Sequence, residues 1–354
     1  MHSFISFFKK SPAFVLAVLF IALFETALHF VPNLHYLDGR GAFFTYYKRF
    51  LAEDSTKSYD ILIYGDSRSL SLQGQKKDDK NKYSIYNFSL PAAGPRYFPY
   101  FLKKYLKNHS EKPKLVVWAA DPALMMSKKT VSFSDNPALW NEYKHRLLNL
   151  FSISEAWEQY SGYEFFFIMK EYLPHSILTV RHRQGFESLV GIRLESLLSG
   201  KFHLVEENKK LIKFVEEENG KINLGDFFPA PEGASEREIV NHLPVYNTSE
   251  INTEPLRNFL DQCRKENLKV IVLNIPRAEG FHQTLFYRTA EAEIKRLLES
   301  YPEFRYIQFE DMDYPLNLFS ESIHYNFKGG KRVNAEYTEK IVPQFYSYIE
   351  NNEK

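Results

Sequence analysis

Five short apolar runs, separated by stretches long enough to hold a helix, constrain the fold of this chain more than any other feature. The runs cover residues 61–64, 84–90, 114–120, 268–275 and 304–309. Short apolar runs bounded by turn-forming or charged residues are typical of buried strands. Because helix-length connections favour parallel strands with right-handed crossovers, the sequence predicts an α/β protein with a parallel five-stranded sheet.

The runs fall into two groups with a different kind of sequence between them. Residues 58–122 and 251–354 alternate strand and helix patterns, whereas residues 123–250 show helical periodicity and few strand signals. A chain of 354 residues also exceeds one ordinary domain. We therefore expect an α/β domain with a mainly helical insertion, placed as a cap that shapes access to a site.

The N-terminus carries a long apolar segment. Residues 12–31 are nearly all apolar and number enough to cross a bilayer as a helix. No small-x-small cleavage site follows, so the sequence predicts an uncleaved anchor over residues 1–31 and a connector over residues 32–57. Basic residues lie on both sides and leave the orientation open. A short tail before a large domain usually leaves that domain outside, and we expect an extracytoplasmic position, periplasmic or at the cell surface.

Composition excludes several classes of function. With 45 basic and 44 acidic residues the formal net charge is +1, so the chain has no electrostatic footprint for nucleic acid. The single cysteine, Cys263, excludes an internal disulfide and a cysteine-based metal cluster. The eleven histidines show no ligand spacing with carboxylates, so we expect neither a metal nor another cofactor.

A candidate nucleophile lies where the first apolar run ends, in the stretch DILIYGDSRSL. Gly65 permits a sharp bend, and Asp66, Ser67 and Arg68 follow it. A serine just past a buried strand lies at the carboxyl edge of the sheet, where open α/β folds bind ligands. The alternative is that Asp66 and Ser67 only cap a helix, as Asp and Ser often do.

A candidate base lies near the C-terminus, in ESIHYNFKGG. Glu321 precedes His324 by three residues, so in a helical turn the two side chains share a face and the carboxylate orients the imidazole. The segment follows the last strand and is expected at the same edge as Ser67. The backbone amides of Ser67 and Gly94 are then candidate oxyanion donors. The alternative is that His324 caps or packs against the following helix.

Three motifs together resemble the SGNH (GDSL-like) hydrolase and acyltransferase superfamily. They are GDSRS at 65–69, NFSLPAAG at 87–94 and ESIHYNFKGG at 321–330. Among its branches the chain is most similar to membrane-anchored members related to the D-alanyl transfer protein DltD and the alginate O-acetylation proteins. The resemblance implies a three-layer, flavodoxin-like fold, with Ser67 as nucleophile, His324 as base and Gly94 as oxyanion donor. Glu321 stands where the family usually has Asp.

The chain departs from the family at the third motif, where an oxyanion asparagine is replaced by Asp121 in AADPAL. An ionised carboxylate repels a developing oxyanion, so Asp121 must be protonated, turned away, or paired with Arg68 or Arg96. Asn87 and Asn274 are alternative donors. Arg277, just past the fourth apolar run, is expected nearby.

Two functions fit this sequence. The first is a membrane-anchored serine esterase or O-acyltransferase acting on an acylated cell-envelope polymer, alone or within an envelope acyl-transfer complex. The second is a catalytically degenerate binding or assembly protein of such a complex, which the aspartate at position 121 favours.

Overall fold

The computed structural model describes the parts of the chain whose placement is defined. These are residues 12–30, 36, 40–90, 98–126, 154, 165–166, 169–170, 174, 177–181, 203–222, 243–320 and 323–351. The chain divides into two compact units, which we describe separately. The first comprises residues 1–46 and 144–210, and the second comprises residues 47–143 and 211–354.

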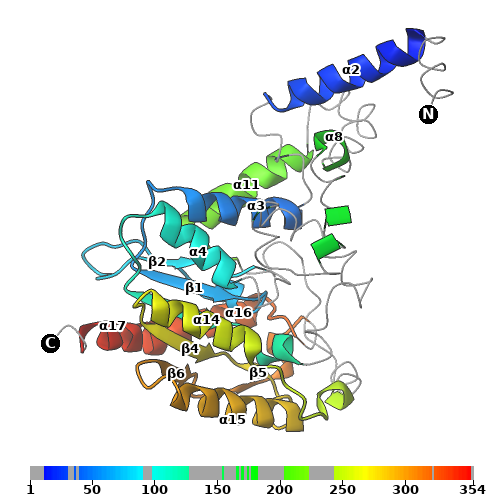
Figure 1. The fold of residues 1–354 in the computed structure, drawn as a ribbon. Helices are drawn as coiled ribbons and strands as arrows, with labels where there is room; N and C mark the ends of the chain where they lie inside the picture. The colour runs from blue at the N-terminus through cyan, green and yellow to red at the C-terminus, as the bar shows by residue number, and fades with distance from the viewer. Residues whose placement is uncertain are drawn as a thin grey trace. The chain divides into compact units, whose positions relative to one another are not determined.

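The second unit is built on a five-stranded parallel sheet, as predicted (Figure 1). Its strand order is β2-β1-β3-β4-β6. The bounds are β1 Ile61–Gly65, β2 Ile85–Asn87, β3 Leu115–Ala119, β4 Val270–Asn274 and β6 Arg305–Gln308. Four of the strands fall within the apolar runs, and β1 extends one residue beyond its run, to Gly65. The strand order is compatible with a flavodoxin-like fold. The strand β1 lies next to both β2 and β3, so its carboxyl end is flanked by theirs.

Helices cover both faces of the sheet and make it the middle of three layers. Leu62, Tyr64 and Trp118 point to the face covered by α4 (Phe98–Asn108) and α14 (Glu254–Lys265), where Tyr64 and Trp118 pack on Phe98 and Phe259. The alternate strand residues share a core with the helices of the other face. Those helices are α15 (Leu285–Glu299), α16 (Phe327–Glu336) and α17 (Val342–Glu350).

A second, two-stranded sheet was not predicted. It pairs β5 (Arg277–Ala278) with β7 (Asp313–Tyr314) in parallel, beyond the carboxyl ends of β4 and β6. Two residues are too few to show a period in the sequence. The pairing arises because both segments leave neighbouring strands in the same direction.

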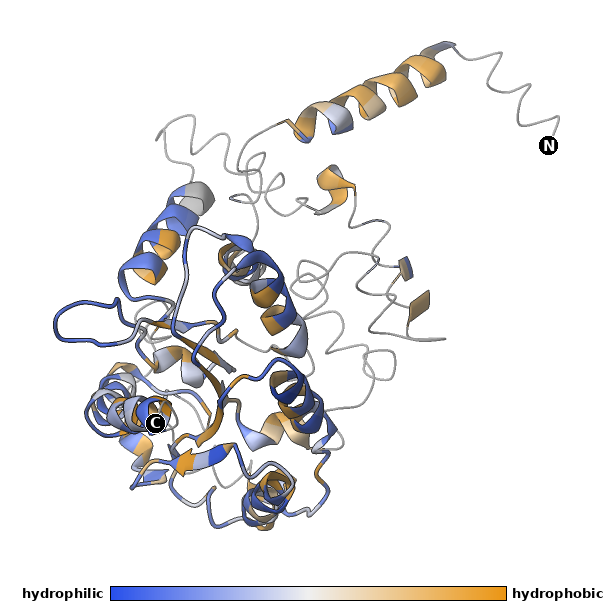
Figure 2. Cartoon of the chain, turned by 60° about the vertical axis from the view of Figure 1, so that its left-hand side comes forward, coloured by the Kyte–Doolittle hydropathy of each residue, from blue (hydrophilic) through white to orange (hydrophobic). Residues whose placement is uncertain are grey.

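Among the described residues, several helices begin in or belong to the first unit, including two near the N-terminus and one in the middle of the chain. These three are α2 (Pro12–Leu28), α8 (Leu178–Arg181) and α3 (Arg40–Glu53), the last of which continues into the second unit. Figure 2 shows α2 as almost uniformly hydrophobic, whereas the helices around the sheet carry both hydrophobic and hydrophilic residues. Among the residues that the structure describes, no helix meets the length and hydropathy needed to cross a membrane. Most of the predicted cap, residues 123–250, lies outside the described residues, apart from segments such as α11 (His203–Glu217).

Candidate active site

The turn after β1 is tightly packed and depends on Gly65. A Cβ atom at this position would lie 2.0 Å from Ser69 Oγ and 2.8 Å from the Ala119 carbonyl oxygen of β3. No other residue fits between the two without a shift of backbone. The Ser69 hydroxyl donates a hydrogen bond to the Asp66 carbonyl at 3.0 Å, and a 3₁₀ helix covers Ser69–Ser71. The turn therefore presents Ser67, which is only partly buried, at the carboxyl edge of the sheet.

The structure brings Ser67 and His324 together across 257 residues of sequence. Ser67 Oγ lies 2.7 Å from His324 Nε2. This is the distance of a hydrogen bond, and the contact is partly buried. With Nε2 unprotonated, the hydroxyl donates to the imidazole, which is the arrangement that a serine nucleophile and a general base require.

His324 lies in a closed loop and not in the helical turn that we expected. Phe319 and Tyr325 form an antiparallel bridge, and Ser320 donates from its backbone N–H to the His324 carbonyl at 2.9 Å. In a helix the donor and acceptor would be reversed, so the pattern is that of a hairpin. Asn326 then caps α16 by accepting from the Gly329 N–H at 3.0 Å. His324 therefore does not cap the helix.

Several predicted site residues fall outside the described part of the chain. Glu321, predicted to orient His324, is one of them. Gly94 and Arg96, in the segment after β2, are the others. Their predicted roles stay predictions.

Asn87 is not available as an oxyanion donor, contrary to our expectation. Its Nδ2 atom donates to the carbonyl oxygens of Ser69 at 2.7 Å and Leu72 at 2.8 Å. Its Oδ1 atom accepts from the Ser89 N–H at 2.9 Å. The side-chain amide has two N–H donors, and both are used. Asn87 therefore stabilises the backbone that follows Ser67 and donates to no ligand.

Asp121 is engaged by positive charge, one of the three states that we had left open. Its carboxylate pairs with Arg68, which is 6% exposed, and accepts from Arg277 Nε at 3.0 Å. The Tyr287 hydroxyl donates to it at 2.9 Å and the Ala123 N–H at 2.7 Å. With 1% exposure, the carboxylate has exchanged water for four protein donors. Its charge is therefore compensated and turned into the protein.

Asp66 ties this cluster to the serine turn. Its carboxylate accepts from the Arg68 N–H at 2.8 Å and from the Asp121 N–H at 2.7 Å. The two acceptor oxygens thus join the ends of the neighbouring strands β1 and β3. Because Asp66 and Arg68 flank Ser67 on either side, the backbone of the nucleophile turn is held by buried, charge-assisted hydrogen bonds.

Arg277 links the same cluster to β4. It donates to Asn274 Oδ1 at 2.7 Å, and Asn274 Nδ2 donates to the Tyr306 hydroxyl at 2.9 Å. The guanidinium lies 4.1 Å from the centre of the Tyr287 ring. Asn274, our other alternative oxyanion donor, is therefore held in this network.

Tyr287 was missed by sequence reasoning. Burial raises the pKa of its hydroxyl to about 12, against the opposing effect of Arg68 and Arg277. The hydroxyl therefore remains protonated at neutral pH and acts as a donor to Asp121. Nothing in the sequence of α15 distinguishes Tyr287 from an ordinary core residue.

The burial of Lys48 was also not predicted from the sequence. Its ammonium group is fully buried and donates to three carbonyl oxygens: Asn87 at 2.6 Å, Ser89 at 2.7 Å and Gly220 at 3.0 Å. Burial lowers the pKa of Lys48 well below its ordinary value. Gly220 has a positive φ of 91°, and a Cβ there would lie 2.2 Å from the Asn87 oxygen. Lys48 and Gly220 together hold the end of β2, from which the chain runs toward Gly94.

Fold and geometry define an α/β protein with a serine–histidine pair at the carboxyl edge of a parallel sheet. The chain belongs to the family described as "Protein of unknown function (DUF1574)", whose model matches residues 17–331. A search of curated proteins finds no match.

Proposed function

We propose that this chain is a serine ester hydrolase or O-acyltransferase of the SGNH type. The observation that carries the proposal is the 2.7 Å contact between Ser67 Oγ and His324 Nε2. Support also comes from the parallel sheet, which has the strand order of flavodoxin-like folds, and from the position of Ser67 directly after its first strand. The two residues are 257 positions apart in the sequence, so it is the fold that brings them together at this edge.

In the proposed reaction, Ser67 Oγ attacks the carbonyl carbon of an acyl ester while its proton passes to His324 Nε2. The alcohol then leaves with that proton, and the acyl group stays on Ser67. Water or a sugar hydroxyl attacks the acyl-enzyme, giving hydrolysis in the first case and transfer in the second. We assign Glu321 to orienting the imidazole and the amides of Ser67 and Gly94 to the oxyanion.

Asp121 occupies the position where the SGNH superfamily usually has an oxyanion asparagine, and this difference is compatible with the proposed acyl transfer. A repelling carboxylate near the oxyanion would raise the barrier, but Arg68 and Arg277 compensate the charge of this one and Tyr287 donates a hydrogen bond to it. The site then relies on two backbone donors. Loss of one oxyanion donor typically costs roughly a hundredfold to a thousandfold in rate, so we expect a working but slow enzyme.

We also propose that the N-terminal segment anchors the domain to a membrane, with the site on the extracytoplasmic side and an acylated envelope polymer as substrate. Support comes from α2, a 17-residue helix on which Leu16, Phe20 and Leu23 are each more than 60% exposed. A helix with several solvent-exposed apolar side chains is typical of a segment that contacts a membrane. Flotation of the full chain with vesicles, compared with a chain that starts at residue 32, tests this part by itself.

Labelling with a fluorophosphonate probe tests the catalytic proposal. The wild type is expected to become labelled at Ser67, and Ser67→Ala and His324→Ala are expected to abolish labelling. Ser58→Ala, at an exposed serine elsewhere in the chain, is the matched control and should label as the wild type does. Labelling that survives Ser67→Ala would exclude Ser67 as the nucleophile.

The second candidate function is a non-catalytic binding or assembly protein. The observation that favours it is the presence of an aspartate at position 121, because the SGNH superfamily usually has an asparagine there that donates a hydrogen bond to the oxyanion. A folded wild type that no fluorophosphonate labels, and that hydrolyses none of a panel of aryl and sugar esters, would favour this second function over the first.

A further inference from the structure

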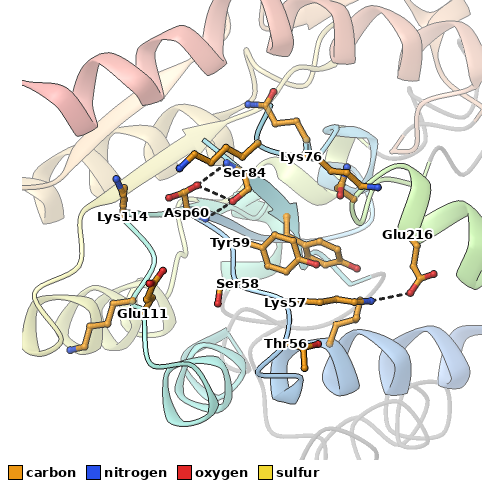
Figure 3. Close-up of a pocket in the computed structure, with 16 residues that line it drawn as sticks. Thr56, Lys57, Ser58, Tyr59, Asp60, Lys76, Ser84, Glu111, Lys114 and Glu216 are labelled. Carbon is orange, nitrogen blue, oxygen red and sulfur yellow. Dashed lines mark hydrogen bonds and ion pairs between the residues drawn. The ribbon is translucent and has the colours of Figure 1, made fainter. Parts of the chain in front are cut away.

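A cavity lies at the amino edge of the sheet, opposite the edge that carries Ser67, and Figure 3 shows the residues that line it. Asp60 precedes β1, Ser84 precedes β2 and Lys114 precedes β3, and all three line this cavity of about 660 Å³. Asp66 and Asp121, by contrast, follow β1 and β3 at the carboxyl edge. Because β1 has five residues at about 3.3 Å each, the cavity is roughly 16 Å or more from the serine turn. It is therefore a separate site, and its volume is in the range of small-ligand pockets.

Positive charge dominates the rim. In the described part of the chain five lysines line the cavity, against three carboxylates. The lysines are Lys57, Lys76, Lys77, Lys112 and Lys114. Lys57 is paired with Glu216 at 3.1 Å, and Lys112 with Glu266, outside the cavity, at 2.7 Å. Lys76 and Lys77 are exposed and extend the positive rim beyond these pairs, so an anionic group is the favoured occupant.

The wall includes a buried hydroxyl that has no partner. Tyr86 is 1% exposed and lines the cavity, and its Oη atom has no hydrogen-bond partner. Burial, together with Tyr59, Tyr47 and Glu216, keeps the pKa of Tyr86 well above its ordinary value. The hydroxyl is therefore a neutral donor. The Oη atom itself has almost no accessible surface, so Tyr86 contributes its ring to the wall and stiffens it against the neighbouring Tyr59.

The remaining wall suits a hydroxylated ring. The Tyr59 ring packs on Tyr86 with centroids 4.7 Å apart and is itself only half-buried, which leaves aromatic surface toward the cavity. The carboxylates of Asp60, Glu111 and Glu216 stand among the lysines. Carboxylates repel a bare polyphosphate but accept hydrogen bonds from sugar hydroxyls. Lysine donors, carboxylate acceptors and an aromatic face therefore occur together in one cavity.

We infer that this cavity binds an acidic carbohydrate, with its carboxylate or phosphate group among the lysines of the rim and a sugar ring against Tyr59. The inference goes beyond the proposed function, because binding here requires neither Ser67 nor His324. The carboxylate and phosphate forms share the same chemistry, and separate ligands distinguish them.

Isothermal titration of the full chain tests this inference. The probes are an oligogalacturonate, a phosphorylated oligomannose, the neutral oligomannose and inorganic phosphate. At least one acidic oligosaccharide is expected to bind at least tenfold more tightly than the neutral one and than inorganic phosphate. Raising the salt from 50 to 500 mM should weaken that binding severalfold, because the lysines are exposed.

Variants assign the binding to the cavity. Lys76→Gln with Lys77→Gln is expected to weaken binding of the acidic oligosaccharide tenfold, and Tyr59→Leu severalfold. Lys80→Gln with Lys265→Gln removes the same charge from exposed positions outside the cavity and should change binding less than twofold. Ser67→Ala should bind as the wild type does, so failure of the catalytic proposal is seen separately. Equal binding of neutral and acidic sugars, equal binding of phosphate, or no effect of the lysine variants would overturn the inference.

Discussion

The two edges of the sheet use charge in opposite ways. At the carboxyl edge Asp66, Arg68, Asp121 and Arg277 are each at most 6% exposed and are bound to one another or to backbone. At the amino edge the charged rim is largely in water, with single ion pairs such as that of Lys57 and Glu216. Buried charges must be paired and hold a fixed geometry, whereas exposed charges are screened and free to adapt. The first arrangement suits positioning of a nucleophile, and the second suits capture of a ligand.

The largest effect is expected from breaking the serine–histidine pair at the carboxyl edge. Ser67→Ala and His324→Ala should each lower esterase or transferase turnover roughly a thousandfold or more, with little change in the free energy of unfolding. The double variant should be about as slow as either single variant, since the residues act as a unit. Initial rates on an aryl ester measure this. Additive losses would show that the two side chains act separately.

A large loss of stability is expected when the Asp121 carboxylate is removed from the buried charge cluster. Asp121→Ala leaves Arg68 and Arg277 buried without their carboxylate, and should lower the free energy of unfolding by about 3–5 kcal/mol. Urea titration followed by circular dichroism measures it. The control is Asp311→Ala, which removes a half-exposed partner of Arg332 and should cost about 1 kcal/mol or less. Equal losses in the two variants would remove the contrast between buried and exposed pairs.

A smaller effect is expected at the edge of the same cluster. Tyr287→Phe removes one donor to Asp121 but keeps the ring beside Arg277, so it should lower the free energy of unfolding by about 1–1.5 kcal/mol. Because the pKa of Tyr287 is raised to about 12, the loss should be the same between pH 6 and 9. A loss that varies across this range would mean that Tyr287 ionises there.

The smallest effect is expected at the amino edge. Burial of Glu216 is outweighed by the Tyr47 hydroxyl and by Lys57, which lower its pKa from its ordinary value of 4.5. A lowered carboxylate pKa stabilises the folded state above that value, and this stabilisation disappears as the pH falls through the folded-state pKa. Glu216→Gln should therefore lower stability by about 0.5 kcal/mol or less at pH 7 and by less at pH 3, since the side chain is 47% exposed. Thermal unfolding at both pH values checks the difference.

Most of the α/β framework was predictable. Each predicted strand coincides with an observed one, although β1 extends one residue beyond the predicted run, to Gly65. The first four are buried parallel strands, which are short apolar runs, whereas β6 is partly exposed. The prediction of a helical turn at His324 was wrong, because a three-residue spacing between Glu321 and His324 does not require a helix. The bridge between Phe319 and Tyr325 is a pairing that no local pattern reveals.

The sequence by itself determined which residue types are present for chemistry and at which strand ends they occur: a serine after the first strand and a histidine after the last. Local apolar periodicity encodes those positions, since it reports the burial of each segment separately. Only the tertiary structure decided that Ser67 and His324 touch, that Asn87 and Asn274 are committed elsewhere, and that Asp121 is neutralised by Arg68 and Arg277. Those facts depend on side-chain partners contributed by distant segments, and their energies exist only once the chain has excluded water from between them.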